Sequence, residues 1–261
     1  IGGCAGLIGP LLQLESPAAI ELAVLAGDRL LQAQADNGSW RQSNRQPGLL
    51  GFSHGTAGYA AALARLHQAT GEERFIRGAR QALIHERGHF HGDAGNWPDF
   101  RGQQQSGKGP SYMVSWCHGA PGIALGRACL WGTSLWDEQC AEELTIGLNT
   151  TATLMPQGMD HLCCGSLGLM VLLRELAQGP WPVDECVREL ALDQAMHLHK
   201  QALDRCKGTL PQLRCFGTQE GNLVLPGFFT GLSGMAMALL DDKRSRIGTQ
   251  RLLSAGLSPN Y

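Results

Sequence analysis

The chain has 261 residues, of which 43% are hydrophobic, so it is long enough to bury a large core. Its formal net charge is −2, and no basic stripe indicates a nucleic-acid partner. No apolar run reaches the roughly 20 residues that a membrane span needs. The first residues lack the charged region and cleavage pattern of a signal peptide. We therefore expect a cytoplasmic protein whose partners are peptides or small molecules.

A Gly-x-x-Gly step recurs five times along the chain, and an apolar helical stretch follows each copy. The spacing between copies alternates between shorter and longer, with Gly6 taken as the counterpart of Gly55 in the first copy. This pattern is typical of a helical-hairpin repeat. In chain order the copies are GCAGLIG (Gly3–Gly9), GFSHGTAG (Gly51–Gly58), WCHGAPG (Trp116–Gly122), CCGSLG (Cys163–Gly168) and GFFTGLSG (Gly227–Gly234).

A second, more amphipathic helix is predicted after each glycine copy and its inner helix. These segments have apolar positions at i, i+3 and i+4. Strand signals are nearly absent, so we expect an all-α fold of inner and outer helices. The predicted outer helices are Pro17–Gln34, Glu72–His85, Asp137–Leu154, Asp184–Leu203 and Lys243–Ala255.

The glycines have two possible roles. If the repeats close into a ring, the helix starts converge on one end of its cavity, where their N–H groups favour anions, thiolates included. Alternatively, the glycines are helix C-terminal caps and packing contacts in an ordinary solenoid.

Nine cysteines are present, an odd count that does not form the dense framework of a small secreted scaffold. Cys129, Cys186 and Cys206 fall in helices and are read as small buried hydrophobes. Cys117, Cys163 and Cys164 differ because they lie at Gly-x-x-Gly helix starts of two successive repeats. Cys4, Cys140 and Cys215 give no clear signal.

Three converging cysteines match the ligand count of a catalytic zinc site, which keeps its fourth position open. The vicinal pair Cys163–Cys164 can place both sulfurs on one metal if the chain turns there, and Gly165 supplies such a turn. The alternatives are a vicinal disulfide or two unrelated buried thiols.

Four segments together resemble the lanthionine synthetase C-like family, and in particular the cyclase domain of class II lanthipeptide synthetases. The resemblance runs from the first residue to about Leu240. It implies an α/α toroid of seven inner and seven outer helices, of which about five repeats are present here. The segments are Ser115–Arg127 (SWCHGAPGIALGR), His161–Met170 (HLCCGSLGLM), Gly51–Leu63 (GFSHGTAGYAAAL) and Asn96–Arg101 (NWPDFR).

The resemblance also implies a longer protein. Residues 1–261 are then a partial cyclase domain, and about two repeats and an N-terminal dehydratase domain precede Ile1. An aspartate that the family places near the active site has no counterpart that we can identify in this sequence. We expect the first inner helix to expose apolar flanks.

The activity that the resemblance implies is zinc-dependent thioether formation in a dehydrated precursor peptide. A cysteine thiol of the peptide adds to a dehydroalanine or dehydrobutyrine of the same peptide. Cys117, Cys163 and Cys164 match the positions of the zinc ligands. Many family members have Cys-His where this chain has Cys163–Cys164, so we expect a more electron-rich and more substrate-tolerant site, and slower cyclisation for Cys164→His.

Three histidines lie beside the predicted site. His54 matches the family's signature histidine and is expected to donate a proton to the enolate or to accept one from the thiol; otherwise it is a capping or packing residue. His118 either shares this proton transfer or supports a ligand by a hydrogen bond. His161 is either a support for the cysteine pair or structural.

The segment Gly88–Gly109 is the longest stretch without a helix pattern. His89, His91 and Asp93 within it suggest a second metal site, but an exposed loop fits the composition better. Trp97, Asp99 and Arg101 are expected to be structural rather than to contact a peptide, with Asp99 paired either to Arg101 or to a helix start.

Two other functions are alternatives to a cyclase. A sugar-processing toroid needs a carboxylate pair beside a cleft, and no such pair stands at the repeat starts. A non-catalytic protein that binds zinc and a glutathione-like thiol would keep the same site but would not consume a dehydrated peptide.

Overall fold

The computed structural model describes residues 3–41, 48–101, 110–154, 158–207, 213–214 and 225–240. Helices dominate these residues, which confirms the predicted all-α fold. The helices are α1 (Cys4–Gln13), α2 (Pro17–Ala33), α3 (Thr56–Thr70), α4 (Glu73–Arg87), α6 (Ala120–Leu130), α7 (Glu138–Thr153), α8 (Ser166–Gln178), α9 (Glu185–Arg205) and α10 (Leu232–Leu240).

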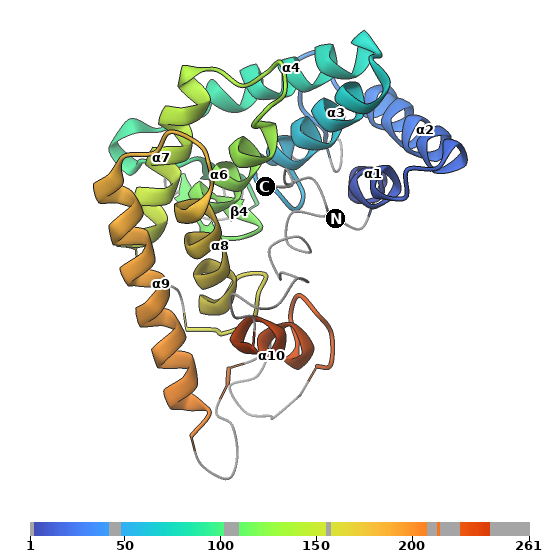
Figure 1. Cartoon of the computed structure of the whole chain (residues 1–261). Coiled ribbons are helices and arrows are strands. Elements are labelled where there is room, and N and C mark those ends of the chain that lie inside the picture. The colour runs from blue at the N-terminus through green and yellow to red at the C-terminus, as the bar shows by residue number, and fades with distance from the viewer. Residues whose placement is uncertain are drawn as a thin grey trace.

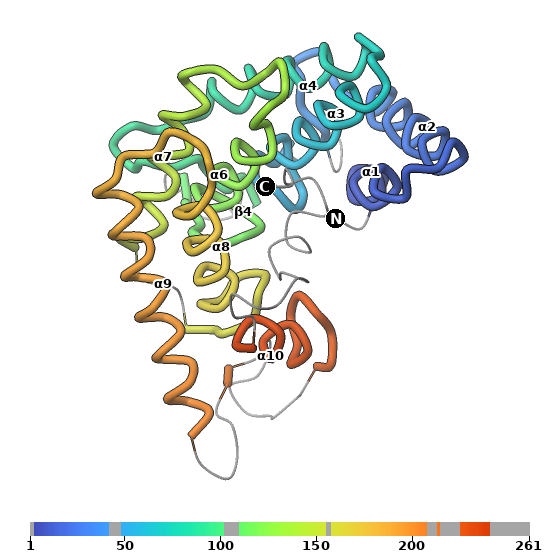
Figure 2. Tube along the Cα trace, in the orientation of Figure 1, coloured from blue at the N-terminus to red at the C-terminus, as the bar shows by residue number. Residues whose placement is uncertain are grey.

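Consecutive helices pack as antiparallel hairpins, and the hairpins follow one another in an arc (Figure 1). Each inner helix contacts the next inner helix, in the order α1, α3, α6, α8 and α10. The outer helices α2, α4, α7 and α9 each pack against the inner helix that precedes them. The same path from α1 to α10 can be followed in the Cα trace (Figure 2). This is the inner-and-outer arrangement of an α/α toroid.

Glycine recurs at the inner helix starts because another part of the backbone lies against it. A Cβ at Gly58 would meet the carbonyl oxygen of Phe52, and a Cβ at Gly168 would meet that of Leu162. Each of these carbonyls belongs to the residue six positions before the glycine. The first glycine of the step caps the helix in an extended conformation at Gly55 and Gly165, whereas Gly119 caps α6 with a positive φ. The glycines therefore mark helix N-termini, and the alternative that they are C-terminal caps is wrong for these steps.

The first copy has a different register from the one predicted. Gly3 caps α1, while Gly6 lies inside the helix. Gly3 is therefore the counterpart of Gly55, and Cys4 occupies the first helical position, as Thr56 does in α3. The run of three glycines at positions 3, 6 and 9 fits the step in two registers, so the sequence could not decide between them.

The outer helices α2, α4, α7 and α9 begin and end within about two residues of their predicted bounds, which is ordinary variation at helix ends. The fifth predicted outer helix, Lys243–Ala255, lies outside the described residues.

The segment between α4 and α6 contains short elements that the sequence did not predict. A 3₁₀ turn, η1 (Gly92–Ala94), precedes an antiparallel pair of β1 (Pro98–Asp99) and β2 (Ser111–Tyr112). A second antiparallel pair joins β3 (Val114–Ser115) to β4 (His118–Gly119) immediately before α6. Two-residue strands are too short to show a period-2 pattern, so no strand signal can be recognised in the sequence.

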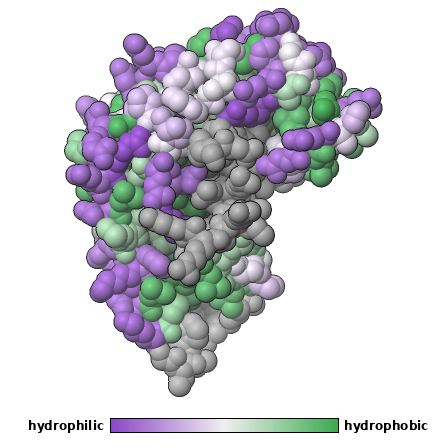
Figure 3. Space-filling model, in the orientation of Figure 1, coloured by the Kyte–Doolittle hydropathy of each residue, from purple (hydrophilic) through white to green (hydrophobic). Residues whose placement is uncertain are grey.

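The larger of two hydrophobic core clusters runs along the arc, and both ends of the arc carry exposed leucines. Leu14 and Leu25 in the first hairpin are 67% and 64% exposed, and Leu240 at the end of α10 is 79% exposed. The expected apolar surface at the first inner helix is thus present, with Leu7 exposed on α1. Polar residues cover much of the side formed by α7 and α9 (Figure 3).

The cysteines outside the glycine turns differ in burial. Cys129 is fully buried in α6, as predicted. Cys186 is exposed and Cys206 is only partly buried, so the prediction that these two are core residues is wrong: Cys186 lies in the first turn of α9, on its solvent side. No described helix is long and apolar enough to cross a membrane.

Candidate active site

Three cysteines from two successive glycine turns meet at one point. Cys117 lies in the turn between β3 and β4, and Cys163 and Cys164 lie in the turn that precedes α8. The Sγ atom of Cys164 is 3.5 Å from that of Cys117 and 3.5 Å from that of Cys163. Among the described residues this is the one group of three or more potential ligand side chains close enough to hold a metal ion. The predicted convergence of the three sulfurs is confirmed.

The spacing of the sulfurs suits a metal ion. Two thiolates bound to one tetrahedral zinc ion lie about 3.8 Å apart, given Zn–S bonds of about 2.3 Å. A disulfide requires an S–S distance of about 2.05 Å, and all three cysteines are free. The vicinal disulfide considered from the sequence is therefore absent, and the donor set fits zinc.

The charges of the cluster also favour a cation. Contacts with the thiols of Cys163 and Cys164, together with the hydroxyl of Ser115, lower the pKa of Cys117 to about 2. The contact with Cys117, together with burial, raises the pKa of Cys164 to about 11. Contacts with Cys117 and Cys164 raise the pKa of Cys163 as well. The cluster by itself thus holds one thiolate readily, because further thiolates would repel it at this distance. A divalent cation would allow all three sulfurs to ionise.

Backbone contacts between repeats hold the turns in register. The carbonyl oxygen of Cys117 accepts a hydrogen bond from the N–H of Ser53 at 3.3 Å. A side chain at Gly51 would collide with that same carbonyl. On the other side, the N–H of Cys163 donates to the carbonyl oxygen of Phe229 at 2.9 Å. The cysteine turns are therefore clamped between the second and the last described glycine turns.

The positive φ of Gly119 shapes the turn after Cys117. Its φ is +72°, and a Cβ there would meet the carbonyl oxygen of Met113. The side-chain oxygen of Asn96, buried at 1% exposure, accepts from the N–H of Ala120 at 2.7 Å. This hydrogen bond anchors the first turn of α6. The turns that begin α3 and α8 are anchored by other contacts.

Two histidines lie beside the cysteines. His54 precedes the cap glycine of α3, and His118 follows Cys117; their rings stack with centroids 6.2 Å apart. His54 is exposed, whereas His118 is buried, and among the described residues its Nε2 atom has no partner. Burial lowers the pKa of both, and the charge of Arg101 lowers each further. Both rings are therefore neutral at neutral pH and can accept a proton.

His161 has a structural contact in the cysteine turn. It is fully buried, and its Nδ1 atom accepts a hydrogen bond from the N–H of Cys164 at 3.2 Å. Of the two predicted readings, support for the cysteine pair fits this contact.

Asp99 and Arg101 pair as predicted. Arg101 donates from Nε to Oδ1 at 3.0 Å and from Nη2 to Oδ2 at 2.8 Å. Burial alone would raise the pKa of Asp99, but hydrogen bonds from Arg101 and the electrostatic effect of nearby His118 hold this pKa below its usual value. The pair thus lies in the electrostatic surroundings of the candidate site, and Asp99 is an acidic group there that the sequence assigned only to structure.

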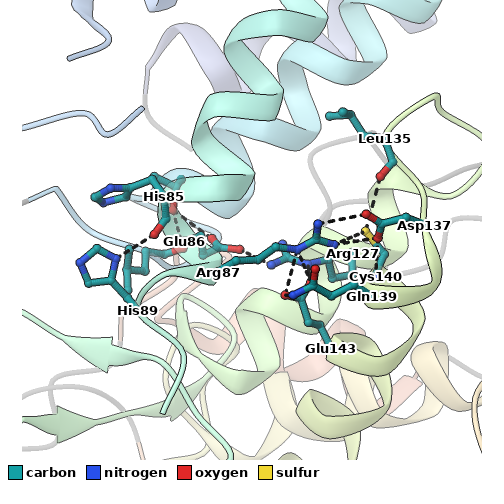
Figure 4. Close-up of polar contacts among 12 residues, drawn as sticks. His85, Glu86, Arg87, His89, Arg127, Leu135, Asp137, Gln139, Cys140 and Glu143 are labelled. Carbon is teal, nitrogen blue, oxygen red and sulfur yellow. Dashed lines mark hydrogen bonds and ion pairs between the residues drawn. The ribbon is translucent and has the colours of Figure 1, made fainter. Parts of the chain in front are cut away.

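A buried ionic network supports the start of α3 (Figure 4). Arg127 of α6 is 2.6 Å from Glu86 of α4 and 2.6 Å from Glu143 of α7, and these three side chains are almost fully buried. Glu86 also accepts a hydrogen bond from the hydroxyl of Thr56, the first residue of α3, at 2.9 Å. This network links four helices directly behind the turn that carries His54.

The other histidine segment forms no metal cluster among the described residues. The Nδ1 atom of His91 lies 2.7 Å from the hydroxyl of Tyr112, and the rings of His85 and His89 are tilted to each other with centroids 4.6 Å apart. The exposed-loop interpretation therefore fits His91 and Asp93 better than a second metal site does, whereas residues 96–99 of the same segment are buried.

The chain is similar to known proteins in sequence and in structure. The family model described as lanthionine synthetase C-like protein matches residues 1–247. A solved structure of nisin cyclase matches with a TM-score of 0.63 and 16% sequence identity, over 97% of this chain. The chain spans 64% of the length of that nisin cyclase chain. No curated protein matches it.

Proposed function

The chain belongs to the lanthionine synthetase C-like family, and on this premise we propose that it is a cyclase that forms thioether rings in a dehydrated precursor peptide. The observation that carries the proposal is the meeting of Cys117, Cys163 and Cys164, because three thiol sulfurs within 4.8 Å of one another serve a metal better than they serve a hydrophobic core. The likeness to nisin cyclase supports the fold of such an enzyme.

Cys117, Cys163 and Cys164 would hold a zinc ion. When bound, zinc lowers the pKa of a coordinated thiol, so that a substrate thiolate is available at neutral pH. Three protein sulfurs leave the fourth tetrahedral position open for the substrate. Cys163 and Cys164 are only partly buried, which gives a peptide thiol access to the cluster.

His54 is proposed to move the proton. Its ring is neutral at neutral pH because its pKa is lowered, so it can take the proton from the incoming cysteine thiol. The sulfur then forms a bond with the β-carbon of the dehydrated residue, and the electron pair of the C=C bond moves to the enolate. The α-carbon takes a proton from the imidazolium of His54, so the reaction needs no oxidant or reductant.

His118 is proposed to share this proton transfer. It lies within stacking distance of His54, and its buried Nε2 atom has no partner among the described residues. An unpartnered buried ring nitrogen is costly, and a substrate group or a water molecule would satisfy it.

We further propose that the cyclase works with an N-terminal dehydratase domain, and that residues 1–261 are part of its cyclase domain.

The experiment is a cyclisation assay with a dehydrated precursor peptide. Free peptide thiols are counted by alkylation and mass spectrometry after incubation with the chain, with its Cys117→Ala variant and with a Cys186→Ala control. We expect thiols to disappear with wild type and the control and to persist with Cys117→Ala. If wild type binds zinc and thiols but leaves the dehydrated peptide unchanged, the chain is a thiol-binding protein and the cyclase proposal is wrong.

A further inference from the structure

Asp160 is a fully buried carboxylate three residues before Cys163 that the proposed reaction does not use. Its Oδ1 atom accepts a hydrogen bond from the hydroxyl of Ser166 at 2.8 Å. Its Oδ2 atom accepts from Nε of Arg205 at 3.1 Å and from the N–H of Arg214 at 2.8 Å. One side chain thus ties together the start of α8, the end of α9 and the segment at 213–214.

These contacts lie on both sides of the cysteine pair. The N–H of Asp160 donates to the carbonyl oxygen of Arg214 at 3.0 Å, and its carbonyl oxygen accepts from the N–H of Leu167 at 3.3 Å. Ser166 and Leu167 are the first two residues of α8. The segment that carries Cys163 and Cys164 therefore begins at Asp160, and six residues later its other end is hydrogen-bonded back to Asp160.

The carboxylate is stable in its buried place because cations and donors surround it. Burial alone would raise the pKa of Asp160, but hydrogen bonds from Arg214 and Ser166 and the charge of Arg205 hold it below its usual value. Asp160 is therefore ionised at neutral pH. Neutralising it would remove charge-assisted hydrogen bonds from two arginines, the strongest contacts of this turn.

We propose that Asp160 is a positioning residue for the metal ligands Cys163 and Cys164. It fixes the turn so that both sulfurs already face Cys117 before a metal ion binds. A turn without this anchor would have to be ordered when the metal binds, which costs conformational entropy and lowers affinity. The inference rests on the proposed metal centre.

The test compares Asp160→Asn with wild type in the whole chain. Zinc affinity is measured by competition with a chromophoric chelator, and the ligand set is read from the thiolate-to-cobalt charge-transfer bands of the Co²⁺-loaded protein. We expect about 10- to 100-fold weaker zinc binding and weaker charge-transfer bands, with unchanged far-ultraviolet circular dichroism. A merely structural contact would not alter the cobalt spectrum of a folded variant.

The matched control is Asp204→Asn. Asp204 lies one residue before Arg205 and pairs with Lys200 and Lys207 at the surface, so we expect no change in zinc affinity. Wild-type zinc affinity and a wild-type cobalt spectrum in Asp160→Asn would overturn the positioning role.

Ser166→Ala decides the question if Asp160→Asn does not fold. It removes one contact to Asp160 and should weaken zinc binding about threefold, and an unchanged affinity would overturn the proposal. A wild-type chain that binds zinc but does not cyclise a peptide would refute the proposed function alone. A wild-type chain that binds no zinc would refute both.

Discussion

The turns that begin α3 and α8 share one local hydrogen-bonding arrangement, which serves a different purpose in each turn. Each has an extended cap glycine, then a hydroxyl residue, Thr56 or Ser166, whose side chain donates to a fully buried carboxylate. The carboxylates are Glu86 and Asp160. They differ in where they come from, because Glu86 belongs to the outer helix α4 and Asp160 belongs to the turn itself.

The partners of the two carboxylates differ in exposure. The side chain of Arg127, beside Glu86, is 1% exposed, whereas those of Arg205 and Arg214, beside Asp160, are 21% and 50% exposed. The α3 turn is thus locked into the core by an ion pair that water does not reach. The α8 turn is instead held by Arg205 and Arg214, which are partly exposed to solvent. We infer that the contacts of Glu86 stabilise the fold behind His54, and that the contacts of Asp160 set the geometry of the cysteines.

The largest expected effect is that of Arg127→Met. The change leaves Glu86 buried without its cation, whereas Glu143 keeps Arg87. Breaking a buried pair in this way costs about 3–5 kcal/mol of unfolding free energy. Arg205→Met should cost only about 1.5 kcal/mol, because Asp160 keeps Arg214 and Ser166. Urea unfolding of both variants gives the comparison, and equal losses would show that the two clusters do not differ as described.

Acid should act on the α8 turn through Asp160. Because the pKa of Asp160 is lower in the folded chain than in the unfolded chain, its contribution to stability is complete above the usual aspartate pKa of about 3.9 and is lost as pH falls further. Asp160→Asn should therefore be less stable than wild type at pH 7, and the difference should shrink towards pH 3. Urea unfolding of the metal-free proteins at several pH values measures it, and a gap that is independent of pH would contradict the assignment.

The smallest effects separate the two roles most sharply. Thr56→Ala and Ser166→Ala each remove one hydroxyl donor from a buried carboxylate, at a cost of about 1 kcal/mol. Only Ser166→Ala should also weaken zinc binding, because only this hydroxyl belongs to the cysteine turn. Calorimetric zinc titration of the two variants shows the difference, and weakening in both or in neither would remove the distinction between the turns.

Much of this arrangement could be predicted from the sequence, because glycine recurs at the starts of the inner helices. The inner helix starts at Gly55, Gly119 and Gly165, the outer helices and the three converging cysteines followed from spacing and from residue type. The first copy was misplaced by three residues because Gly3, Gly6 and Gly9 repeat at the interval of the step itself.

The buried carboxylates could not be predicted from the sequence. Glu86 lies in an amphipathic helix and resembles any solvent-facing acid, and its partner Arg127 is 41 positions away. Asp160 stands directly before HLCCG, and this position beside the cysteine pair is the one sequence signal that could have indicated its role. Its cation, Arg205, comes from the end of a helix 45 positions later. Such pairings depend on how helices pack, and sequence periodicity does not report them.

Metal content tests the central claim most directly. Elemental analysis of the purified chain should find one zinc ion per chain in wild type and in the exposed-cysteine control Cys186→Ala, and none in Cys117→Ala or Cys163→Ala. Zinc in wild type that disappears in both cluster variants is the result that this account predicts. A folded wild-type chain without zinc, after expression with zinc supplied, would contradict it and would leave the three thiols without a catalytic role.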